Sequence, residues 1–286
     1  MKASTRPLAI APDTAVDFQL HTTNSDGTWA PEQLIDYLVS EGFGLAAITD
    51  HDRLDTIAAV TEMAAQKGLP LLPALEITAA WKGQSTDLLC FGIDPANAAL
   101  DEVVQTIARR QHENTRGVFE NLRQKGITFP EEDALQAVLD APSSSHLGRL
   151  SKLLKKHGHG DHHDVRWHLI REAGGEFSSI DVAPAVDAVH QAGGVCLIAH
   201  PGRGGNNLKY DLELLDEFRK TIPIDGIEAH YPQHSPEQTA AFVAYAEQHD
   251  LLTSSGSDSH GPDGHLPIKY RAELSRRLLE RCGIEV

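Results

Sequence analysis

The chain has 286 residues, of which 41% are hydrophobic and 23% are charged. This length and balance exclude a disordered, collagen-like or coiled-coil chain, and at about 150 residues per domain they indicate one large domain or a barrel with an insertion. Asp and Glu number 41 against 25 Lys and Arg, a formal charge of −16. Because such a surface repels a phosphate backbone, duplex nucleic acid is not an expected partner.

The first third of the chain alternates short apolar runs with amphipathic stretches. Residues 16–21 alternate, which predicts a strand with Asp17, Gln19 and His21 on one face. Apolar periodicity predicts further elements in this order: helix 31–42, strand 45–49, helix 57–67, strand 69–75 ending near Glu76, and strand 88–93 with Asp87 at its start. Strands alternating with helices predict a parallel sheet, either open or closed into a barrel.

Residues 99–175 break this rhythm. Helical patterns occupy 99–125, 131–139 and 147–157, and no strand pattern separates them. We therefore expect residues 99–175 to form a helical insertion, a lid on a barrel built from residues 15–98 and 176–286.

The strand and helix rhythm resumes after the insertion. The predicted elements are helix 181–192, strand 194–199, strand 224–228, helix 236–249 and strand 251–255. Residues 271–282 are amphipathic and are predicted to form a helix that closes the barrel.

Polar residues follow the predicted strands where each strand ends. They are His21, His51, Glu76, His200, and Asp258 with His260. In a parallel barrel the carboxyl ends of the strands meet at one rim, so these side chains can meet in space. Buried charges without partners are costly, whereas divalent cations neutralise carboxylates and bind neutral imidazoles. The pattern therefore favours a metal cluster over a structural polar network.

Cysteine and hydropathy patterns indicate the cellular compartment. Three widely spaced cysteines provide neither a disulfide framework nor a thiolate zinc site. No apolar run approaches the ~18 residues of a membrane span, and the N-terminal residues carry no secretory signal pattern. We therefore expect a cytoplasmic protein without a membrane partner. The sequence leaves the oligomeric state open.

Six segments, in order, resemble the motifs of the PHP (polymerase and histidinol phosphatase) family. They are Asp17-Phe-Gln-Leu-His21-Thr with Ser25-Asp26-Gly27, Ile48-Thr-Asp-His51-Asp, Ala74-Leu-Glu76-Ile, Ala199-His200-Pro201-Gly202, Gly226-Ile-Glu228 and Gly256-Ser-Asp258-Ser-His260. The resemblance is to the subgroup of nucleotide and oligonucleotide phosphoesterases that carries a helical insertion. It implies a distorted seven-stranded α/β barrel with two or three Mn, Mg, Fe or Zn ions at its C-terminal rim.

The resemblance also implies a set of metal ligands. Position by position these are Gln19, His21, Glu76 and Asp258 for one ion, Glu76, Asp87 and His200 for a second, and Asp26, His51 and His260 for a third. Gln19 and Asp87 stand where the family usually has histidine. Their oxygen ligands shift the expected metal towards Mn or Mg and away from Zn.

The implied reaction is hydrolysis of a phosphate ester by a metal-activated hydroxide that bridges the ions near Glu76, His200 and Asp258. Small nucleotides or short oligonucleotides are the expected substrates. Two alternatives remain open: a sugar or histidinol phosphate phosphatase, and a degenerate metal-binding module with a regulatory role. The expected substrate contacts are Arg203, His146, Arg149, His230 and His234. A further arginine usual in the subgroup is replaced by Ser144.

Two further sequence features are weaker evidence for function. Trp81 and Trp167 could stack on a base, but ordinary packing is the preferred interpretation of both. The histidine-rich segment 155–163 is interpreted as a solvated loop outside the site.

Overall fold

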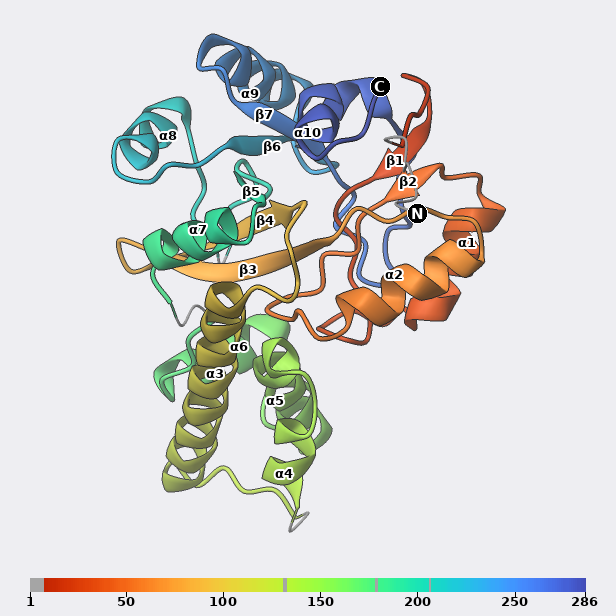
Figure 1. The fold of residues 1–286 in the computed structure, drawn as a ribbon. Coiled ribbons are helices and arrows are strands. Elements are labelled where there is room, and N and C mark those ends of the chain that lie inside the picture. Colours follow the sequence, from red (N-terminus) through yellow and green to blue (C-terminus); the bar gives the residue numbers. More distant parts are fainter. Residues whose placement is uncertain (1–7, 131–132, 178–179, 206) are drawn as a thin grey trace.

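The computed structural model describes residues 8–130, 133–177, 180–205 and 207–286. It is a mixed α/β fold in which helices surround two groups of strands. The helices of residues 98–172 extend away from the strands on one side (Figure 1). The start of the described chain lies beside its end, because Ala9 pairs with Glu285.

The larger sheet has five strands in the order β3-β4-β5-β6-β7. They are β3 (Ala74–Trp81), β4 (Gln84–Phe91), β5 (Val195–Ile198), β6 (Gly226–His230) and β7 (Leu252–Ser255). β5, β6 and β7 are parallel, as predicted, whereas β4 is antiparallel to both β3 and β5. The prediction of a parallel sheet is therefore wrong for this half of the sheet.

A tight turn explains the antiparallel pair. Lys82 and Gly83 join β3 to β4 with φ values of 51° and 75°, the positive values that a two-residue hairpin turn requires. β3 therefore continues beyond Glu76 instead of ending there, and Asp87 lies within β4, opposite Thr78. The predicted strand 69–75 begins only at Ala74, since Pro70 and Pro73 lack the N–H that pairing needs.

The smaller sheet contains β1 (Ala15–Asp17), β2 (Leu45–Ala46) and β8 (Tyr270–Arg271), in the order β2-β1-β8. β1 is shorter than predicted because side chains accept the backbone N–H groups that a ladder would use, and β2 is limited to Leu45 and Ala46. Thr49 Oγ1 accepts from the amide of Leu20 at 3.2 Å, and Asp50 accepts from the amide of Thr22 at 2.7 Å.

Single bridges join the two sheets at both seams. His51 pairs with Glu76 at one seam and Leu20 pairs with Ser259 at the other. The strands thus form a distorted barrel, which confirms the predicted fold class, but the described residues show no continuous hydrogen-bonded closure. The bridges bring the ends of β1, β2, β3 and β7 to one place.

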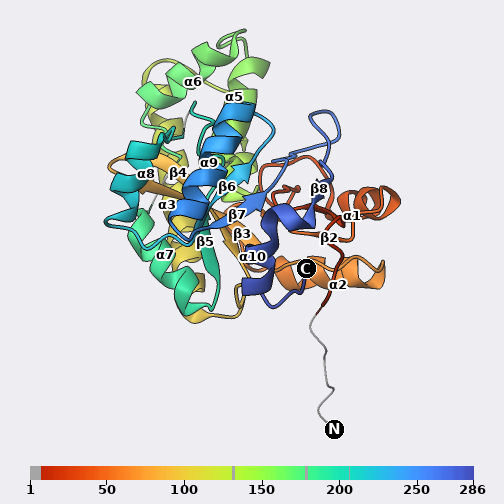
Figure 2. The ribbon, with the colours of Figure 1, turned by 90° about the horizontal axis from the view of Figure 1, so that it is seen from above.

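Six helices pack around the strands, as Figure 2 shows from above. They are α1 (Pro31–Ser40), α2 (Ile57–Gln66), α7 (Val182–Gln191), α8 (Leu212–Arg219), α9 (Pro236–Gln248) and α10 (Arg276–Arg281). α7 contacts β3 and β5, and α9 contacts β6 and β7. The sequence did not predict α8, and the predicted helix 271–282 is divided into a 3-10 turn (Ala272–Ser275) and α10.

The intervening helices form a bundle with its own apolar cluster. They are α3 (Ala98–Gln124), α4 (Ala134–Leu139), a 3-10 turn (Ser143–Ser145), α5 (His146–Lys156) and α6 (His163–Glu172). Leu122, Leu150, Leu154 and Ile170 are fully buried in this cluster. Residues 131 and 132 of the predicted helix 131–139 lie outside the described residues, and α6 was not predicted. Among the described residues no helix has the length and apolar character of a membrane span.

Candidate active site

Glu76 lies at the centre of a buried group of histidines. Its Oε2 lies 3.1 Å from Nε2 of His21 and 3.8 Å from Nε2 of His51, and its Oε1 lies 3.4 Å from Nε2 of His200. Glu76 is 1% exposed and His21 is fully buried. Four segments that are distant in the sequence thus meet around one carboxylate.

The loop after β7 adds two more groups. Asp258 Oδ1 lies 3.3 Å from Nε2 of His21, and His260 Nε2 lies 3.4 Å from Oδ2 of Asp26. The ring of His21 stacks between those of His51 and His260, with centroid distances of 4.7 and 4.2 Å. Imidazole and carboxylate groups therefore also lie close together on this side of His21.

Gln19 and Asp87, the two departures from the usual motifs, also reach the cluster. The amide of Gln19 donates to Oε2 of Glu76 at 3.2 Å. Asp87 Oδ2 lies 3.7 Å from Nε2 of His200 and accepts a hydrogen bond from the amide of Asn207. Both residues are buried, so each could present an oxygen to a shared ion.

The donor atoms fit divalent cations. Four of them have no hydrogen-bond partner in the described structure: Gln19 Oε1, His21 Nδ1, His21 Nε2 and Asp87 Oδ1. Buried polar atoms are nearly always paired, so unpaired nitrogen and oxygen atoms in one buried cluster are groups whose bonding a cation could complete. Three sets have ligand atoms that lie within 4.8 Å of one another: His21, Asp26, His51 and His260; His21, Glu76 and Asp258; and His51, Glu76 and Asp87.

A cleft of about 520 Å³ opens over this cluster. Its lining includes Asp87, His200, Asp258 and His260 of the cluster, Arg203 and Asn207, and Trp167 and Phe177 of the helical bundle. Its volume is in the range of small-molecule sites.

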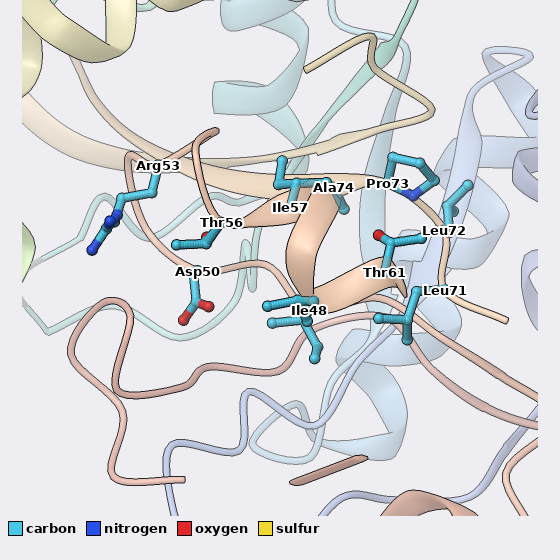
Figure 3. Close-up of a pocket in the computed structure, with 11 residues that line it drawn as sticks. Ile48, Asp50, Arg53, Thr56, Ile57, Thr61, Leu71, Leu72, Pro73 and Ala74 are labelled. Carbon is cyan, nitrogen blue, oxygen red and sulfur yellow. The ribbon is translucent and has the colours of Figure 1, made fainter. Parts of the chain in front are cut away.

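A smaller pocket beside α2 differs in size and lining. It holds about 20 Å³, room for about one water molecule, and aliphatic side chains line most of it. The charged ends of Asp50 and Arg53 point away from these aliphatic groups (Figure 3). Of the two, the large cleft is the one whose size matches a small-molecule site.

No family model matches the chain. It is 30% identical to a 3',5'-nucleoside bisphosphate phosphatase of Chromobacterium violaceum, over 91% of this chain and 92% of that protein. It is 29% identical to the 5'-3' exoribonuclease Rnm of Salmonella typhimurium, over 94% and 91% of the two chains. A solved structure from Bifidobacterium adolescentis, described as a candidate metal-dependent phosphoesterase, superposes with a TM-score of 0.75 at 27% identity, covering 95% of this chain and 98% of that one.

The chain belongs to the PHP family. This confirms the resemblance drawn from the six motifs. The PHP protein is a hydrolase of phosphoester bonds, and divalent metal ions are the cofactors of this chemistry.

The electrostatics of the PHP site depend on its histidines. Burial disfavours the charged imidazoles, but contacts with Asp258 and Glu76 raise the pKa of His21 to about 9. Burial also disfavours the charged form of His260, but Asp26 and Asp258 outweigh burial and raise the pKa of His260 to about 9. Glu76 and Asp26 raise the pKa of His51 to about 8. Burial opposes ionisation of Glu76, yet the surrounding imidazoles hold the pKa of Glu76 well below its ordinary value.

These shifts predict how the metal-free PHP protein responds to pH. The folded pKa values of the three histidines lie above the ordinary 6.5. Protonation therefore stabilises the metal-free fold fully below pH ~6.5, and this stabilisation is lost as pH rises through about 8 to 9. Because metals displace these protons, apparent metal affinity should rise over the same range. Thermal unfolding with chelator and with Mn²⁺ should therefore show a difference in Tm that widens from pH ~7 to ~9, and a constant difference would contradict this assignment.

Three buried carboxylates that sequence reasoning did not assign to the site hold its backbone. Asp17 accepts from the amides of Ser257 and Ile268, both at 2.9 Å. Glu228 accepts from the amide of His200 at 2.8 Å. Asp50 accepts from Thr22 and Ser25 at 2.7 Å and so orders the turn before Asp26. All three lie within the motif segments quoted above; Asp17 and Glu228 are isolated carboxylates in apolar runs, and Asp50 precedes His51.

Gly27 ends the turn that presents Asp26. A Cβ atom there would lie 2.7 Å from the backbone carbonyl of His21, which cannot move without displacing a metal-site histidine. We expect Gly27→Ala to lower the free energy of unfolding by about 1–3 kcal/mol. Gly117→Ala on the exposed side of α3, where a Cβ meets no atom within 4 Å, is the matched control and should be neutral or stabilising. Denaturant unfolding measures both, and equal effects would contradict the prediction.

The five expected substrate contacts occupy different environments. Arg203 lines the cleft and lies 2.9 Å from Oδ2 of Asp258. His146 is buried in the helical bundle, where its two nitrogens contact Thr115 and the carbonyl of Ala141. Arg149 is exposed and donates to Ser145. His230 and His234 are not among the residues that line the cleft.

His234 instead supports the loop that carries Arg203. Its Nε2 accepts from the amide of Gly202 at 3.0 Å, and its Nδ1 donates to the carbonyl of Ala229 at 3.1 Å. This pattern fixes a neutral tautomer, in agreement with a pKa of His234 that burial lowers. His234 thus contacts the loop behind Arg203, and its contact with the substrate stays a prediction.

Proposed function

We propose that this chain hydrolyses phosphate esters of nucleotides or short oligonucleotides, with two or three divalent ions held by the buried cluster. The observation that carries the proposal is the overlap of three donor sets at Glu76, His21 and His51 beneath a cleft of about 520 Å³. The proposed ligands are Gln19, His21, Asp26, His51, Glu76, Asp87, His200, Asp258 and His260.

Divalent ions in such a site lower the pKa of a bound water, align it with phosphorus and stabilise the leaving oxygen. Side chains of the protein hold the ions and bind the phosphate group. Glu76 directs one oxygen to His21 and the other to His200, so its carboxylate is suited to bridge two ions. Arg203 is held by Asp258, which also accepts from the hydroxyl of Tyr231 at 3.2 Å. The further N–H groups of this guanidinium are suited to the phosphate oxygens of the substrate.

The names of the relatives and the charge of the chain support a small nucleotide substrate. The relatives are named as a nucleoside bisphosphate phosphatase and an exoribonuclease. A formal charge of −16 opposes broad binding of a nucleic-acid backbone, whereas a cation-filled cleft attracts a small anion locally.

We propose Mn²⁺ or Mg²⁺ as the native ions. Gln19 and Asp87 contribute oxygen where imidazole would favour Zn²⁺. The test begins with chelator-treated protein reloaded with Mn²⁺, Mg²⁺, Fe²⁺ or Zn²⁺, followed by measurement of bound metal and of hydrolysis of AMP, adenosine 3',5'-bisphosphate, a dinucleotide, ribose 5-phosphate and histidinol phosphate. Turnover of only the last two would replace the nucleotide assignment with a sugar or histidinol phosphate phosphatase. Fewer than two bound ions and no turnover would indicate a metal-binding module.

Gln19→His tests the first departure directly. An imidazole in place of the amide should tighten metal binding by about 10–100-fold, because even residues that only hydrogen-bond to a metal ligand change metal affinity by that factor. It should also shift the metal preference towards Zn²⁺. Metal titration followed by elemental analysis measures this. Gln66→His on the exposed side of α2 is the control and should leave affinity unchanged. An unchanged affinity in Gln19→His would remove Gln19 from the ligand set.

A further inference from the structure

Two aromatic side chains, here called the aromatic wall, line the cleft that the candidate ligands also line. Trp167 of α6 and Phe177, which follows that helix, line the same cleft as Asp87, His200 and Arg203. Both aromatic residues are half-buried. Their inner sides pack on the apolar cluster of the helical bundle, and their remaining surface is left to the cleft.

The position of Trp167 is fixed by two neighbours. Its indole N–H donates to Nε2 of His163, one turn earlier in α6, at 2.6 Å. Its ring lies 5.1 Å from the ring of Phe177 at an interplanar angle of 42°. A ring held in this way loses little side-chain entropy when a ligand binds. His163 also lines the cleft, although the sequence placed its segment outside the site.

Packing alone does not account for Trp167 as it does for Trp81. Trp81 is 7% exposed in the core of the larger sheet, against Phe218. Trp167 lines the cleft, and charged and polar groups make up most of the rest of the lining. The cleft lining thus combines candidate metal ligands with an aromatic wall, and a nucleotide has a phosphate for the first and a base for the second.

We propose that Trp167, supported by Phe177 and His163, stacks on the nucleobase of the substrate and so selects nucleotides over phosphate esters that lack a base. This inference rests on the proposed function and adds the residue that determines its substrate class. Stacking tolerates any base, since every base has a π-face, so the wall should discriminate little between purines or between pyrimidines of similar size.

The first experiment compares Trp167→Ala and Trp167→Phe with the wild type on AMP and on ribose 5-phosphate. Loss of one stacked ring should lower kcat/KM for AMP by roughly 10- to 100-fold, mostly through KM, and should leave the value for ribose 5-phosphate within about twofold. Trp167→Phe should retain most of the AMP activity. Equal losses on both substrates, or none on AMP, would overturn the stacking role while leaving the phosphoesterase assignment intact.

A binding experiment tests the same contact without turnover. Trp29 and Trp81 are 6% and 7% exposed, so Trp167 is the tryptophan whose fluorescence a base in the cleft should quench. In metal-loaded protein, immediately after mixing, we expect AMP to quench the wild type and Trp81→Phe, but not Trp167→Phe, and ribose 5-phosphate to quench none. Persistent quenching in Trp167→Phe would overturn the proposal. Absence of hydrolysis in every variant would count against the proposed function alone, because quenching still reports the contact.

Discussion

Glu76→Gln is expected to lower kcat/KM for nucleotide hydrolysis by roughly 10³-fold. The substitution keeps the size of the side chain but removes the charge that three imidazoles face within 3.8 Å. It also replaces one carboxylate oxygen with an N–H donor, which cannot bind a cation. Elemental analysis should show fewer than two ions per chain, since the same carboxylate is shared by two of the donor sets.

Glu62→Gln is the matched control for this change. Glu62 is exposed on α2 and contacts only Gln66 among the hydrogen bonds described, so metal content and kcat/KM should both stay at the wild-type value. Circular dichroism would establish that Glu76→Gln remains folded. A folded Glu76→Gln protein with full metal content and activity within about tenfold of the wild type would refute the central position of this carboxylate.

Arg203→Ala is expected to lower kcat/KM by roughly 100-fold, the cost of one lost donor to a phosphoryl group. Arg203→Lys should recover only part of this loss, because an ammonium keeps the charge but lacks the planar fork. Burial opposes the charge of Arg203, but the neighbouring Asp258 raises the pKa of the guanidinium, so it is charged throughout the working range and its loss should not change the shape of the pH profile.

The metal content of Arg203→Ala separates two explanations. Arg203 contacts Asp258, a proposed ligand, so a variant that loses its ions would show that Arg203 holds the ligand in place and does not bind phosphate. Full metal content with the expected loss of rate would support the phosphate contact. Arg109→Lys on the exposed side of α3 is the control and should behave as the wild type.

Local patterns predicted most elements of the fold. The predicted helix 31–42 and the predicted strands 194–199 and 251–255 appear, slightly shortened, as α1, β5 and β7. The antiparallel pairing of β3, β4 and β5 was missed because strand direction depends on the turn at Lys82 and Gly83. α6 was missed because glycine and histidine obscure its beginning, and its packing on the bundle decides that it is helical.

The candidate site, like the fold, was predicted from the sequence only in part. The types and order of the polar residues indicated a shared cluster, because few other arrangements tolerate so many carboxylates and imidazoles after apolar runs. The environments of His146 and His234 were not visible, since each depends on which carbonyl or amide lies within reach of a ring nitrogen. Such contacts join residues that no local spacing relates.

The sequence by itself determined the family and the identity of the metal-capable side chains, because six motifs fix residue types at strand ends whatever the details of pairing. Only the tertiary structure decided that Asp17 and Glu228 hold the loops of the site, and that Trp167 lines the same cleft as the candidate ligands. The first finding depends on how the barrel strands pack against one another, and the second depends on how the helical bundle packs against the barrel. That packing brings together residues more than 200 positions apart, such as Asp17 and Ser257.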